Sequence, residues 1–189
     1  MSDKFRNKYR NQTTRLKSWN YGWNGSYFVT ICTKNKEHFF GEIKNQKTYL
    51  SVIGKYADQC WNEIPEHFPF VKLGKFVVMP NHVHGIVIID KKDDGRLSNP
   101  HVGTQNFASL HGVTSKQTSQ NKFGPQSQNL GSIIRGFKIG VTKQARKIRT
   151  DFQWQARYYD HIIRDQKSLN AISEYILKNP LNWKEDRFF

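Results

Sequence analysis

The sequence is short of acidic residues and of long apolar runs, and each shortage excludes a class of protein. Its 189 residues hold 15 Asp and Glu against 30 Lys and Arg, which gives a formal net charge of +15. A field of that sign and size favours a polyanionic partner, nucleic acid before an anionic membrane surface. No apolar run approaches the roughly 20 residues of a membrane span, and no apolar signal core opens the sequence. We therefore expect a nucleic-acid-directed protein with no part in a membrane.

Cysteine is also scarce. Cys32 and Cys60 stand among apolar neighbours and lack the spacing of a metal site. Two buried thiols in a reduced, cytoplasmic and nucleoid-associated protein are the simplest interpretation. The length fits one domain over residues 1–189, with enough apolar sequence for a proper core.

The most informative stretch is Lys75–Asp90, KFVVMPNHVHGIVIID. Two β-branched and aromatic runs flank a Pro-Asn turn, which predicts paired strands that are apolar on both faces. Alternation along a strand places His82 and His84 on one side and Val83 on the other. Two such imidazoles can hold a divalent cation, although histidines on strands are usually accommodated by packing alone. The pair becomes informative only with the rest of the chain.

Other segments supply the expected elements around that pair. Helical spacing of apolar residues appears over 51–64, where Pro65 should end the helix, and again over 132–149 and 165–179. Strands are expected over 27–33 and, with a bend, over 152–163. Residues 91–131 are rich in Ser, Gln, Asn, Gly, Lys and Thr, which indicates a long polar insertion, mobile or partly disordered.

Basic residues gather in two places. The first is an N-terminal arm over residues 1–20, in which we expect Arg10, Arg15 and Lys17 to contact nucleic acid. The aromatic residues 19, 21, 23 and 27 follow it, and they suit stacking on bases or packing on the sheet equally well. The second is helix 132–149, whose apolar stripe leaves cations around the rest of the circumference and has no acid to pair them. A polyanion contact there is expected through Arg135, Lys138, Lys143, Arg146 and Lys147.

The last helix places Tyr175 and Asn179 one turn apart, and Pro180 should stop the helix at Asn179. Two histidines, a polar third ligand, a tyrosine and a basic surface suit one reaction: phosphodiester transfer through a tyrosine. The adjacent Tyr158 and Tyr159 compete as nucleophiles. We interpret them as a structural pair on the sheet, since neither has a polar partner one helical turn away.

Three stretches resemble the REP-associated tyrosine transposases, within the single-tyrosine HUH superfamily of insertion-sequence transposases. They are YFVTICTKNKEHFFGEI, FVVMPNHVHGIVII, and WQARYYDHIIRD together with AISEYILKNP. The resemblance covers nearly the whole chain apart from the insertion. It identifies His82-Val83-His84 as the HUH motif and the Tyr-Ile-x-x-Asn-Pro segment as the one that carries the nucleophile.

The resemblance implies an α+β fold of the ferredoxin-like HUH type, with a mainly antiparallel sheet and helices against it. It implies Tyr175 as nucleophile, and a site for Mg²⁺ or Mn²⁺ formed by His82, His84 and Asn179. The implied substrate is single-stranded DNA near hairpin repeats, which is cleaved and rejoined through a covalent phosphotyrosine. Whether the protein is a monomer or a homodimer that exchanges the tyrosine helix stays open.

Two other classes of protein are alternatives to this interpretation. A domesticated hairpin-DNA-binding protein without turnover would keep the same basic surfaces, but it would not require both histidines, Tyr175 and Asn179 together. A different metal enzyme finds little support, because the sequence has no H-x-[ST] pair of a two-histidine phosphodiesterase and no H-E-x-x-H of a zinc protease.

Overall fold

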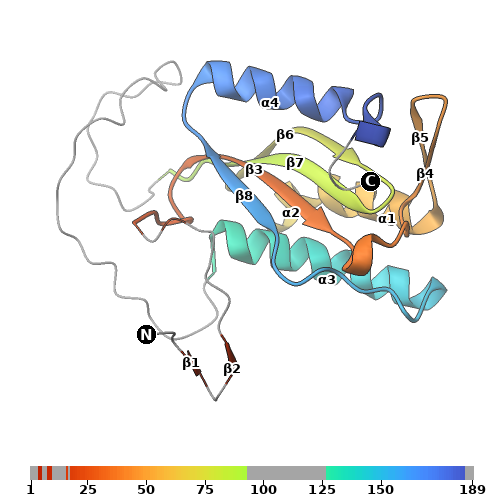
Figure 1. Ribbon diagram of the computed structural model, residues 1–189. Helices are drawn as coiled ribbons and strands as arrows, with labels where there is room; N and C mark the ends of the chain where they lie inside the picture. Colours follow the sequence, from red (N-terminus) through yellow and green to blue (C-terminus); the bar gives the residue numbers. More distant parts are fainter. Residues whose placement is uncertain (1–3, 6–7, 10–15, 17, 93–126, 186–189) are drawn as a thin grey trace.

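A four-stranded antiparallel sheet forms the centre of the computed structural model, which describes residues 4–5, 8–9, 16, 18–92 and 127–185 (Figure 1). Its strand order is β6-β7-β3-β8, so strands distant in sequence lie side by side. The strands are β3 (Gly25–Cys32), β6 (Val71–Val78), β7 (His82–Ile89) and β8 (Tyr159–Ile163). The predicted pair around the histidines is confirmed as β6 and β7.

Helices cover both faces of this sheet, as expected from its apolar strands (Figure 1). One face carries α1 and α3, and the other carries α4. The helices are α1 (Val52–Asn62), α2 (Ile64–His67), α3 (Leu130–Ile148) and α4 (Gln166–Lys178), with short 3₁₀ turns η1 (Lys34–Lys36) and η2 (Trp183–Glu185). Two hairpins complete the chain, β1 (Lys4–Phe5) with β2 (Lys8–Tyr9) and β4 (Gly41–Lys44) with β5 (Lys47–Leu50). The predicted α+β class is confirmed.

The two faces differ in the size of their cores. The face beneath α1 and α3 holds the main core, in which Trp61 and Phe137 meet Val83 and Val87 of β7. The face beneath α4 holds a small core of Phe28, Ile86, Ile163 and Ile176. Because side chains alternate across a strand, β7 can bury valines on one side and carry polar residues on the other.

Each long helix begins at a side chain that accepts a backbone hydrogen bond. Ser51 caps α1, Asn129 forms a reciprocal capping box with Ser132 at α3, and Asp165 caps α4. Such caps satisfy amide groups that have no partner inside the helix. Pro65 does not end the first helix directly: α1 stops at Asn62, and the proline lies in the first turn of α2, where its missing N–H costs nothing.

The predicted strand over 152–163 is wrong in its first half. Only β8 is extended, while Trp154 forms an isolated bridge with Thr33. Arg157 has φ of 67°, which a strand does not allow. Lys138 on α3 donates to the carbonyl oxygens of Gln155 and Arg157, so the helix fixes this irregular segment. The apolar stripe of α3 also ends sooner than predicted, because Ile148 is exposed.

Three of the four aromatic residues after the N-terminal arm, at positions 19, 21 and 27, pack against the main core, as the packing interpretation expects. Tyr27 is fully buried, and its hydroxyl accepts from Nε1 of Trp19 and donates to the carbonyl of Trp23. Tyr21 packs against the main core. These rings therefore stabilise the fold.

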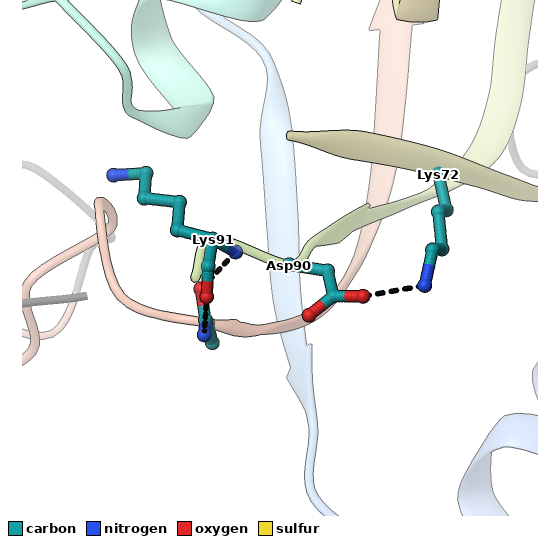
Figure 2. Close-up of polar contacts among 4 residues, drawn as sticks. Lys72, Asp90 and Lys91 are labelled. Carbon is teal, nitrogen blue, oxygen red and sulfur yellow. Dashed lines mark hydrogen bonds and ion pairs between the residues drawn. The ribbon is translucent and has the colours of Figure 1, made fainter. Parts of the chain in front are cut away.

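The chain leaves the sheet after β7 through a set of polar contacts. Asp90 pairs with Lys72 of β6, and the backbone of Lys91 exchanges two hydrogen bonds with the Asn24 side chain (Figure 2). Nζ of Lys91 donates to the carbonyl oxygens of Gly22 and Gln128. The two ends of the expected insertion are thus joined, while most of it, residues 93–126, lies outside the described residues. Within the described part, no helix is long and apolar enough to cross a membrane.

Candidate active site

His82 and His84 lie side by side on β7, on the face covered by α4. Their ring centroids are 4.4 Å apart and both side chains are buried. Val83 between them belongs to the opposite core. The predicted arrangement of the two imidazoles is therefore present.

Each imidazole is fixed through Nδ1. Nδ1 of His84 lies 2.8 Å from the hydroxyl of Thr30 on β3, and Nδ1 of His82 lies 2.7 Å from Oδ1 of Asn81. The amide of Asn81 also donates to the carbonyl of Lys36. An amide oxygen only accepts, so Nδ1 of His82 carries the proton and Nε2 carries a lone pair, as a metal ligand requires. Burial, followed by the charge of Lys36, lowers the pKa of His82 to about 3, so this imidazole is neutral at neutral pH.

Tyr175 reaches the same place from α4. Its hydroxyl lies 3.3 Å from Nε2 of His84, and 45% of the residue is exposed. It is thus held at the imidazole while open to a large substrate. The other two candidate tyrosines lie elsewhere: Tyr158 packs against the main core, and Tyr159 lies on β8, where its ring contacts Phe28.

Asn179 forms the end of α4, as predicted, and is only 3% exposed. Its Oδ1 is buried and makes no hydrogen bond with any residue that the structure describes. A buried carbonyl oxygen in that state is costly unless something binds it.

The donor set fits Mg²⁺ or Mn²⁺. Two imidazoles and an amide oxygen are nitrogen and oxygen ligands of the kind these ions accept. The described ranges hold no cluster of three or more His, Cys, Asp and Glu side chains. Asn179 stays the predicted third ligand, and its buried oxygen without a hydrogen bond is consistent with that role.

Aromatic rings surround the polar groups. Phe28 stacks on His84 at 5.3 Å and meets the Tyr175 ring edge-on at 6.2 Å. Trp183, from the 3₁₀ turn after α4, lies over His82 at 6.1 Å between ring centroids. Thr30, Asn81 and Trp183 were not predicted as residues of this site. Asn81 could have been noticed from its place beside His82, whereas the other two follow from strand register and from the path of the chain after α4.

The basic residues of α3 lie on the other side of the sheet from the histidines. They line an open groove of about 660 Å³, whose cations are Arg135, Lys138, Lys143, Arg146 and Arg157. Lys147 lies on the same helix and donates to Gln144. Arg149, expected to lack an acidic partner, forms a bidentate pair with Asp151 just beyond the helix. Arg10, Arg15 and Lys17 lie outside the described residues.

Lys138 differs from the other cations of the groove. Burial lowers its pKa to about 8, and its ammonium lies over the ring of Trp154 while it donates to two carbonyls. This lysine forms part of the wall of the groove.

No family model matches the chain. A Haemophilus influenzae protein described as uncharacterized is 44% identical over 179 residues, covering 94% of this chain and 92% of its own length. A second protein of that organism, named "Putative REP-associated tyrosine transposase", is 25% identical over 157 residues, covering 83% of this chain and 70% of its own.

A solved structure of a REP-associated tyrosine transposase bound to a REP hairpin is also similar. It has a TM-score of 0.58 and 17% sequence identity, and the match covers 92% of this chain and 74% of that chain. This likeness shows a shared fold.

Proposed function

Since the chain belongs to the family of REP-associated tyrosine transposases, we propose that it cleaves and rejoins single-stranded DNA beside hairpin repeats through Tyr175. The observation that supports this most directly is the 3.3 Å separation between the Tyr175 hydroxyl and Nε2 of His84. A phenol that merely packed on the sheet would not need a half-exposed position at a pair of fixed, buried histidines.

His82, His84 and Asn179 would hold Mg²⁺ or Mn²⁺, which supplies charge stabilisation to the scissile phosphate. Thr30 and Asn81 hold the two imidazole rings, so the ligands need little rearrangement. The Tyr175 oxygen attacks phosphorus and forms a phosphotyrosine as the bond to the leaving sugar oxygen breaks. The proton of the phenol leaves toward solvent, to which the residue is open, and the leaving sugar oxygen takes up a proton from solvent to become a hydroxyl. Attack by a sugar hydroxyl reverses the step and rejoins a strand.

The groove on α3 would hold another part of the DNA. Arg135, Lys143 and Arg146 are exposed there and can neutralise phosphates. Lys147 and the N-terminal Arg10, Arg15 and Lys17 would extend that contact. We assign Lys138 a share in this surface through its position in the wall, since its ammonium is already bound to backbone carbonyls.

A covalent-trapping assay tests the proposal. The protein is mixed with labelled single-stranded DNA copied from hairpins beside its own gene, with and without Mn²⁺, and run on a denaturing gel. A metal-dependent protein–DNA adduct should form with the wild type and Tyr159→Phe and be absent with Tyr175→Phe. An adduct lost only in Tyr159→Phe would move the nucleophile to β8. Binding without an adduct on several hairpins would favour the alternative, a domesticated hairpin-DNA-binding protein without turnover.

A further inference from the structure

Helix α4 covers only part of the face that carries the histidines. It packs over β6 and β7, while β8 lies at the other edge of the sheet, beyond β3 (Figure 1). On β8 the residues facing this side are Tyr159, His161 and Ile163, because they pair with Thr30, Phe28 and Ser26 of β3. Tyr159 and His161 are exposed. The site therefore continues beyond the histidines onto an accessible strip of β8.

The ring of Phe28 contacts both Tyr159 and the proposed nucleophile, Tyr175. Phe28 touches Tyr159 edge-on, with centroids 6.3 Å apart, and the same ring touches Tyr175 at 6.2 Å. Thr30, the residue that pairs with Tyr159 in the sheet, is also the residue that fixes His84. A single strand, β3, thus separates Tyr159 from the imidazole that the Tyr175 hydroxyl contacts.

Tyr159 contacts Phe28 and is still widely exposed. The residue is 45% exposed, equal to Tyr175. Aromatic side chains presented beside a phosphate site commonly stack on unpaired bases, and such contacts tolerate any base. We propose that Tyr159 is the stacking platform for the nucleobase next to the scissile phosphate. The inference rests on the proposed function, and it gives the single strand a defined path from Tyr175 along β8.

The test measures binding and chemistry separately. Binding of a hairpin oligonucleotide with a single-stranded flank is measured with Tyr159→Ala, Tyr159→Leu and Tyr159→Phe, all in the Tyr175→Phe background, where no strand transfer competes. An abasic nucleotide is moved along the flank in the same assay. Thermal unfolding of each variant checks the fold, and Tyr159→Leu keeps apolar contact with Phe28 without a π face.

We expect Tyr159→Ala and Tyr159→Leu to weaken binding by about 5- to 150-fold, with Tyr159→Phe close to the parent protein. One abasic position should weaken the parent by the same factor and have no further effect in Tyr159→Leu. Equal affinity of Tyr159→Leu and Tyr159→Phe, or additive losses at every abasic position, would overturn the proposal. Failure of the proposed function would instead appear as absence of any adduct in the wild type, whatever residue 159 is.

Discussion

The hydroxyl of Thr30 lies 2.8 Å from Nδ1 of His84, across the pairing of β3 with β7. This contact holds the imidazole ring through Nδ1, while Nε2 faces the Tyr175 hydroxyl. Loss of such a partner typically lowers metal affinity or activity 10- to 100-fold. We predict that Thr30→Val weakens Mn²⁺ binding by about that factor, as measured by calorimetric titration. Thr30→Ser keeps the hydroxyl and should bind as the wild type does. Unchanged affinity in Thr30→Val would show that the contact does not position the ligand.

Stability without metal should fall with acid because of His82. Its pKa is about 3 in the fold, against about 6.5 in an unfolded chain, so the unfolded state binds more protons between these values. The free energy of unfolding should therefore have its full value above pH 6.5. It should decrease as the pH falls toward 3, by on the order of a few kcal/mol. Urea titrations in EDTA at several pH values measure this. His82→Gln should show a flatter profile, and an equally steep one would locate the acid sensitivity elsewhere.

Asn179 should contribute to metal binding and should not stabilise the metal-free fold. Its buried Oδ1 has no hydrogen-bond partner in the described structure, and such a group costs about 1–3 kcal/mol. Asn179→Leu should leave apo stability equal or up to about 1 kcal/mol higher. Thermal unfolding with and without Mn²⁺ should show the metal-induced stabilisation in the wild type and its loss in Asn179→Leu. Asn179→Asp, which keeps an oxygen ligand, should retain the response; a full response in Asn179→Leu would remove Asn179 from the ligand set.

Gly85 follows His84 on the strand, and no larger residue fits there. A Cβ at this position would lie 2.2 Å from Cζ2 of Trp61, in the main core. Gly85→Ala should therefore cost about 1–3 kcal/mol of unfolding free energy, as overpacked cores do. Gly25→Ala is a matched control on β3, because its Cβ would meet nothing nearer than 3.6 Å. Chemical denaturation of both variants decides whether the tryptophan can yield.

Substitution of Lys138 on α3 should affect mainly the stability of the fold, whereas substitution of Lys143 should affect mainly DNA binding. Lys138→Met removes two hydrogen bonds to backbone carbonyls and should destabilise the fold by about 1–3 kcal/mol. Lys143→Met changes an exposed residue and should alter stability by less than about 0.5 kcal/mol. In salt titrations of DNA binding, Lys143→Met should lower the slope by about one. An unchanged slope would exclude a phosphate contact at Lys143.

The pKa of Lys138 adds a pH dependence to the same comparison. The folded value is about 8, below the ordinary 10.5, so the unfolded state binds more protons between pH 8 and 10.5. Stability should therefore rise with pH across that window, and Lys138→Met should lack the rise.

Local patterns in the sequence were enough to predict the helices and the strand pair around the histidines. In both kinds of element, the spacing of the apolar residues indicates which side is buried. The same patterns misplaced the start of β8, because Phe152 and Trp154 are apolar residues that pack as irregular chain and not as strand. Lys138 on α3 donates to the carbonyl of Arg157 in this irregular segment. A contact between residues so far apart in the sequence cannot be predicted from local patterns.

The site was predictable where its residues lie close in sequence. His82 with His84, and Tyr175 with Asn179, are spaced by the strand and helix repeats themselves. The meeting of Tyr175 with His84 was expected from the family resemblance alone, since 91 residues separate them. Thr30 and Phe28 could not be found locally, because their places depend on which residue of β3 faces which residue of β7.

The junction made by Lys91 has a consequence for how this protein can be altered. Because the chain leaves after residue 92 and returns at residue 127, at points joined by the Lys91 side chain, a replacement for the sequence between them has to bridge only a short distance. A fluorescent reporter or an affinity handle could therefore be inserted there with a short linker at each end.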